Sequence, residues 1–161
     1  MRKFLILLLP VMLVAACDGK LGYEQGRPGD PPPFKGEWRR YGTMPDFDVL
    51  VNVDAISRDD RYAKDKYVYV WMLQSFRTAQ IDGVSKGKYR KKFTRQAIEC
   101  KSGRMAATTA VLTDENNAEV ARYDVPGYQW EFSTPTPNTY GADFMRQVCQ
   151  IHADKEAAKK Q

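Results

Sequence analysis

The chain contains a single histidine, His152, so any catalytic arrangement or metal site that needs an imidazole must use this residue. Cys149 lies one helical turn earlier, and the Cys-x-x-His spacing is that of half a metal site or of a thiol paired with a base. No second Cys-His pair completes such a site. We therefore interpret His152 as a structural residue of a helix and expect Cys149 to form a disulfide.

Other sequence signatures of enzymes are missing as well. The chain has no Gly-x-Ser-x-Gly motif, no glycine-rich phosphate-binding loop and no His-Glu-x-x-His motif. We expect a protein that is not an enzyme, with no cofactor and no small-molecule substrate.

Two acidic pairs, Asp59-Asp60 and Asp114-Glu115, are the candidates for calcium ligands. The second begins like a calcium-binding loop, but Ala118 occupies a ligand position and the required turn glycine is missing. Both pairs fit hairpin turns, where Asp and Asn side chains bond to the backbone. The sequence therefore predicts no metal site.

Positive charge is densest between Lys86 and Arg95, where six of ten residues are cationic. On a β-strand, Tyr89, Lys91, Phe93 and Arg95 would share one face and interleave aromatic rings with cations. These four residues are the candidate binding patch, which could dock an acidic protein, a glycan or a lipid headgroup. The alternative is a solvated edge strand whose lysines prevent aggregation.

The N-terminus begins with two basic residues, continues with an apolar run over 4–14 and ends in small residues before Cys17. This order is typical of a secretory signal, and the run is too short to span a bilayer. The Val-Ala-Ala-Cys tetrapeptide resembles the bacterial lipobox, in which the cysteine sulfur receives a diacylglycerol before cleavage. We predict that residues 1–16 are removed and that Cys17 anchors the mature chain to a membrane. The alternative is an ordinary signal peptide that contains a cysteine by chance.

Residues 17–36 are rich in glycine and proline and hold too few apolar side chains to bury a core. We expect a flexible tether behind the lipidated cysteine. The formal net charge of +5 falls to +3 when Arg2 and Lys3 are removed with the signal. This mild excess, together with export, makes nucleic acid an unexpected partner.

Two cysteines remain once Cys17 carries lipid, namely Cys100 and Cys149. In an oxidising compartment an isolated pair indicates a disulfide. Closing a loop of about 50 residues would stabilise the fold by about 4 kcal/mol in the chain-entropy model.

Residues 37–155 form one domain, followed by a charged tail at 156–161. Most of its segments have the pattern of β-strands, and we predict strands at 37–41, 47–53, 66–76, 88–100, 103–113 and 119–125. The run at 66–76 is aromatic and β-branched on both faces, as in a strand that is covered on both sides. The last two strands form a hairpin around the turn residues 114–117.

From Pro137 onward the pattern is helical, with one apolar stripe made of Phe144, Met145, Val148, Cys149 and His152. Thr136 is the expected N-cap, and Pro137 suits the first helical position. The predicted fold class is α+β: about six antiparallel strands and one C-terminal helix, packed on one face and tethered by the disulfide. If Cys100 faces the helix, Ile98 faces it too and Phe93 points away.

A set of short motifs resembles the surface-adhesin protein E family over about residues 37–150. Besides the lipobox, these motifs are Trp38, Val70-Trp71, Ile98-Glu99-Cys100, Gln129-Trp130 and Val148-Cys149. The resemblance implies a curved antiparallel sheet with its C-terminal helix held on the concave side by a disulfide. It also implies adhesion to host extracellular-matrix proteins such as laminin and vitronectin, and hence a protein partner on the cell surface.

Asp18 follows the predicted lipidated cysteine. In enteric-type bacteria, an aspartate at this position resembles the signal that keeps a lipoprotein in the inner membrane. Two hypotheses follow. The first is a lipid-anchored, adhesin-like binding protein on the outer membrane or cell surface. The second is an inner-membrane lipoprotein that faces the periplasm and supports an envelope assembly.

Overall fold

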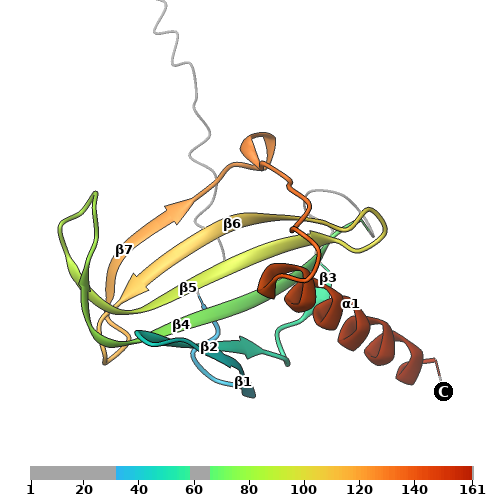
Figure 1. The fold of residues 1–161 in the computed structure, drawn as a ribbon, viewed down its shortest axis with the longest axis horizontal. Coiled ribbons are helices and arrows are strands. Elements are labelled where there is room, and N and C mark those ends of the chain that lie inside the picture. The colour runs from blue at the N-terminus through green and yellow to red at the C-terminus, as the bar shows by residue number, and fades with distance from the viewer. Residues whose placement is uncertain (1–31, 59–65, 161) are drawn as a thin grey trace, which may run out of the picture.

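The computed structural model of the chain describes residues 32–58 and 66–160. Seven antiparallel strands form one sheet in the order β1-β2-β4-β5-β6-β7, with the short β3 paired to β4 (Figure 1). Their bounds are Trp38–Thr43 (β1), Phe47–Asn52 (β2), Ser57–Arg58 (β3), Val68–Ile81 (β4), Lys88–Glu99 (β5), Arg104–Thr113 (β6) and Glu119–Asp124 (β7). The predicted α+β class and the six main strands are confirmed.

The β4–β5 hairpin is longer than predicted. Strand β4 runs to Ile81 instead of residue 76, and its pairing with β5 shifts register between Ser75 and Gln80. Exposed and polar residues follow Phe76, so the alternation that marks a half-buried strand is lost there although the backbone pairing continues.

The C-terminal helix α1 spans Tyr140–Ala158 and begins later than predicted. The side chain of Thr139 accepts a hydrogen bond from the Ala142 N–H, so Thr139 is the N-cap and the prediction of Thr136 is wrong. Asn138 has φ of 60°, a left-handed conformation that a continuous right-handed helix cannot pass through. The helix also extends three residues into the predicted charged tail.

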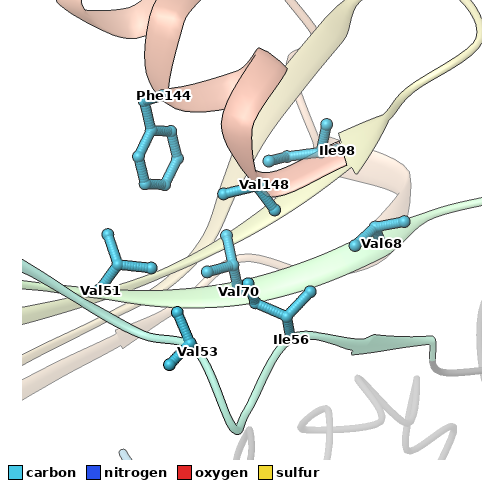
Figure 2. Packing of buried hydrophobic residues seen from close by; sticks show 8 residues of the cluster. All are labelled: Val51, Val53, Ile56, Val68, Val70, Ile98, Phe144 and Val148. Atoms are coloured by element: carbon cyan, nitrogen blue, oxygen red, sulfur yellow. The ribbon is translucent and has the colours of Figure 1, made fainter. Parts of the chain in front are cut away.

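Helix α1 packs on one face of the sheet and closes the larger of two hydrophobic clusters (Figure 2). Phe144 and Val148 of the helix point at side chains from β2, β4, β5 and the β2–β3 connection, and the buried members are Val51, Val53, Ile56, Val68, Val70, Ile98, Phe144 and Val148. Each buried aliphatic or aromatic side chain contributes about 1.5–3 kcal/mol by leaving water. The predicted stripe is therefore the packing face of the helix.

A disulfide joins the end of β5 to the middle of α1. Cys100 and Cys149 have sulfur atoms 2.04 Å apart and Cα atoms 5.8 Å apart, across 49 positions of sequence. The predicted disulfide is confirmed. Ile98 lies on the helix face as its two-residue offset from Cys100 requires, and Phe93 lies on the opposite face.

The opposite face of the sheet has its own core. Trp71, Leu73, Phe93 and Val111 are buried there, and Trp38 packs against them. Both faces of β4 are thus covered, as the absence of alternation at 66–76 predicts.

Residues 32–36, the end of the predicted tether, contact this second core. The Phe34 ring meets Phe93 edge to face at 5.3 Å, and the Trp38 indole N–H donates to the Pro33 carbonyl at 3.2 Å. Domain contacts therefore begin before residue 37. Among the described residues, no helix is long and apolar enough to cross a membrane.

Candidate docking surface

The structure separates the four residues of the candidate binding patch. Phe93 is only 2% exposed, and Arg95 is 7% exposed with its guanidinium carbon 4.3 Å from the centre of the Tyr69 ring. These two side chains belong to the interior and cannot meet a partner. The prediction that all four residues form an exposed face is wrong, because the face opposite the helix is covered as well.

The other two patch residues are partly buried. The Lys91 ammonium donates to the Glu115 carbonyl and to the Asn117 amide oxygen, each at 2.8 Å, and so binds the β6–β7 turn. The Tyr89 ring packs edge to face on Phe76 at 5.6 Å, and burial raises the pKa of its hydroxyl. The alternative of an edge strand is also wrong, since β5 pairs with β4 on one side and β6 on the other.

The exposed part of this region is the tip of the β4–β5 hairpin. We call residues 77–92 the basic hairpin: they hold six cationic side chains and one acidic side chain. Its tip carries two apolar side chains in water, Ile81 at 66% and Val84 at 77% exposed, beside the exposed Lys86 and Lys88. The charge of this segment was predictable from the sequence, but its two apolar residues were not, because single apolar residues in a turn carry no periodic signal.

The tip is held in one conformation by Asp82. The backbone N–H of Asp82 donates to the Gly87 carbonyl at 2.9 Å, while its carboxylate accepts from the Ser85 N–H at 2.7 Å and from the Tyr123 hydroxyl. The bonds from Tyr123 and Ser85 lower the pKa of Asp82 to about 2. The carboxylate is therefore ionised, and able to accept these bonds, at any physiological pH.

A close contact with β7 also fixes the hairpin. A Cβ built on Gly87 would lie 2.3 Å from Cγ1 of Val120, so only glycine fits here without displacement. The tip of the β4–β5 hairpin is thus held against β7, although β6 separates the two in the order of the sheet.

The structure also resolves the candidate reactive groups. Cys149 forms the disulfide with Cys100. His152 is buried, and its Nε2 atom accepts a hydrogen bond from Arg58 Nε at 3.0 Å. Burial and the Arg58 charge lower the pKa of His152. Cys149 therefore has no thiol to bind a metal or attack a substrate, and the Nε2 lone pair of His152 is taken by Arg58.

The acidic residues of the β6–β7 turn have a structural role as well. The Asp114 carboxylate accepts from the backbone N–H groups of Asn116 and Ala118, at 2.8 and 2.9 Å, as expected for a hairpin turn. Within 32–58 and 66–160 there is no group of three or more His, Cys, Asp or Glu side chains that could hold a metal. Cys17, Asp18 and Asp59-Asp60 lie outside the described residues.

Comparison with known proteins gives one family. The sequence profile of the surface-adhesin protein E family matches residues 38–150. A structure of Haemophilus influenzae protein E superposes with a TM-score of 0.51 at 13% identity, covering 77% of this chain and 90% of that one. A selenomethionine form of that protein gives 0.47 at 10% identity, with coverages of 72% and 95%. No curated protein sequence matches. At these identities the first superposition supports the fold alone.

Proposed function

The chain belongs to the surface-adhesin protein E family, and on this premise we propose that it is a non-enzymatic, lipid-anchored binding protein of the cell envelope. We further propose that it attaches to a protein partner through the tip of the basic hairpin. The observation that carries the second part is the pair of exposed apolar side chains, Ile81 and Val84, next to Lys86 and Lys88.

The composition of the tip suits a protein interface. A cluster of exposed apolar side chains on a stable domain marks an interaction site more often than an isolated exposed apolar side chain does. Neighbouring lysines steer an acidic partner toward the tip and set its orientation. Lys88 makes no ion pair with any residue that the structure describes, so its charge is available to a partner.

The rigidity of the tip supports the same proposal. Binding costs free energy for every loop that must be ordered, and a loop already fixed in its bound shape avoids that cost. Asp82 and Gly87 fix this turn before any partner arrives. We propose as partner an acidic surface with a small apolar pocket, and the family resemblance makes host extracellular-matrix proteins such as laminin and vitronectin the first candidates.

Charge reversal at the tip tests the proposal. Binding of the full mature chain to immobilised laminin and vitronectin is measured by surface plasmon resonance at several salt concentrations. Lys86→Glu/Lys88→Glu should weaken binding by about tenfold or more, which corresponds to about 1.4 kcal/mol, and should flatten the salt dependence. Lys101→Glu/Lys160→Glu makes the same charge change at exposed lysines away from the hairpin and should bind as the wild type does. Equal affinity of the two double variants would remove the basic hairpin from the binding site.

The lipid anchor is a separate part of the proposal. It rests on the signal-like N-terminus and on the Val-Ala-Ala-Cys tetrapeptide that ends at Cys17. Intact-mass analysis of the exported protein should give the mass of residues 17–161 plus a diacylglycerol and an acyl chain. A product with an unmodified cysteine would contradict this part and leave the hairpin proposal intact.

Asp18 favours a second candidate function. If this residue retains the lipoprotein in the inner membrane, the domain faces the periplasm and its partner is an envelope component. Membrane fractionation of the wild type beside Asp18→Ser separates the two candidates. A shift of the protein to the outer membrane only in the variant would support the second candidate over the first.

A further inference from the structure

A second surface feature lies where the chain leaves the sheet after β7. Figure 1 shows the segment looping away from the edge of the sheet in a short helical turn, η1 (Gly127–Gln129), before it returns toward α1. On its return, Ser133 pairs with Met105 of β6. An open cleft of about 660 Å³ lies between this loop and β6. It is lined by Ala107, Val125, Tyr128, Gln129, Trp130 and Glu131.

The cleft offers two aromatic rings that differ in exposure and in their contacts with the fold. Tyr128 is 84% exposed, the highest exposure among the large hydrophobic residues that the structure describes. Trp130 is fixed, because its indole N–H donates to the Val125 carbonyl at 2.7 Å and its ring contacts Tyr67 and Phe132 at centroid distances of 5.9 and 6.3 Å. A ligand would thus meet one anchored ring and one ring in open water.

Two polar side chains stand beside these rings. Gln129 and Glu131 are exposed, and neither side chain makes a hydrogen bond or an ion pair with any other part of the described chain. An amide can both donate and accept, and a carboxylate accepts only. The cleft therefore combines apolar faces with hydrogen-bonding groups that the fold itself does not use.

We propose that this cleft binds a neutral saccharide of two or three units. The C–H face of a sugar ring is apolar and packs on an aromatic ring, while its hydroxyl groups donate to a carboxylate and exchange bonds with an amide. The cleft has the volume of ordinary small-molecule sites, which hold about 300–1,000 Å³. Because this site shares no residue with the basic hairpin, the inference goes beyond the proposed function and does not depend on it.

The lining residues disfavour other ligand classes. An anionic glycan would be repelled by the Glu131 carboxylate. A proline-rich peptide in an aromatic groove commonly accepts a hydrogen bond from a tryptophan N–H, and the Trp130 N–H is already occupied by the Val125 carbonyl. A quaternary ammonium ligand could use the same rings and carboxylate, so it is the competitor that the experiment must separate.

Ligand-observed NMR and tryptophan fluorescence test the proposal on the full mature chain. The probes are chitotriose, maltotriose and lactose, with choline chloride as the cationic comparison. At least one saccharide should bind saturably with a Kd of about 1 mM or tighter, and choline should not bind at that affinity. Tyr128→Ala should weaken that binding at least about tenfold, and Glu131→Gln should weaken it by a smaller factor.

Two controls keep the result interpretable. Ile81→Ala removes another exposed apolar side chain, from the basic hairpin, and should leave saccharide binding unchanged. Tyr128→Ala should unfold at the wild-type temperature, since the side chain is exposed. Saturable binding by none of the three saccharides, equal binding by Tyr128→Ala and wild type, or tighter binding of choline than of any saccharide would overturn the proposal.

Discussion

The disulfide between Cys100 and Cys149 should supply a large share of the stability of the domain. The two residues are 49 positions apart, so the chain-entropy model gives a loop-closure contribution of about 4 kcal/mol. Whole domains of this size have about 5–15 kcal/mol of unfolding free energy. Cys100→Ser/Cys149→Ser should therefore remain folded through the contacts of Phe144 and Val148, with its unfolding temperature lowered by roughly 10–20 °C.

Urea unfolding followed by far-UV circular dichroism measures this loss. The wild type is examined with and without a reducing agent, and the double variant without it. The reduced wild type and the double variant should agree within about 1 kcal/mol, because both lack the same cross-link. A loss of unfolding free energy below about 1 kcal/mol in both the reduced wild type and the double variant would refute the reasoning. Residual structure in the unfolded chain would then offset the effect of loop closure.

Three further outcomes follow from the packing. Gly87→Ala forces a Cβ against β7 and should lower stability by about 1–3 kcal/mol and speed amide exchange at 82–87, whereas Gly83→Ala, with nothing within 4 Å of the new Cβ, should not. Phe144→Ala should cost about 3–5 kcal/mol in urea unfolding, and a loss below about 1 kcal/mol would contradict the placement of α1. Burial and the neighbouring Arg58 guanidinium lower the pKa of His152 in the folded chain. On acidification the imidazole is therefore protonated in the unfolded chain before it is protonated in the folded chain. The contribution of His152 to the unfolding free energy should then be complete above about pH 6.5 and should be lost as the pH falls below that value. His152→Gln should flatten the dependence of unfolding free energy on pH. A flat dependence in the wild type would contradict the burial of His152.

The main strands and the disulfide could be predicted because their signals are local. Alternating or continuous β-branched and aromatic residues mark strands, and two remaining cysteines in an exported chain have only each other. The side-chain parity that follows from Cys100 is also correct, since Ile98 faces the helix and Phe93 faces away.

The exposure of the binding patch could not be predicted in the same way. Parity places Phe93 on one face but does not say whether that face is covered. Part of what covers this face of the sheet has no regular secondary structure. Residues 32–36 reach Phe93, and Trp130 packs on the Tyr69 ring. Arg95 lies over the same Tyr69 ring. Such segments have no period, and their placement depends on individual contacts such as the Trp38 bond to Pro33.

The start of the helix shows a similar limit. Thr136-Pro137 and Thr139 are both acceptable N-cap arrangements by residue type. The left-handed conformation of Asn138 decides between them, and Asn is one of the few residues that adopts it readily. The cleft beside Tyr128 and Trp130 likewise arises from the path of the chain after β7, which no sequence pattern predicted.

Protease treatment of intact cells tests most directly whether this domain is displayed on the cell surface. Samples with an intact and with a permeabilised outer membrane are compared, and a periplasmic marker protein reports whether the barrier held. If the protein is a surface adhesin, the domain should be digested on intact cells while the marker survives. A domain that survives until the outer membrane is opened would contradict surface display and support a partner inside the envelope.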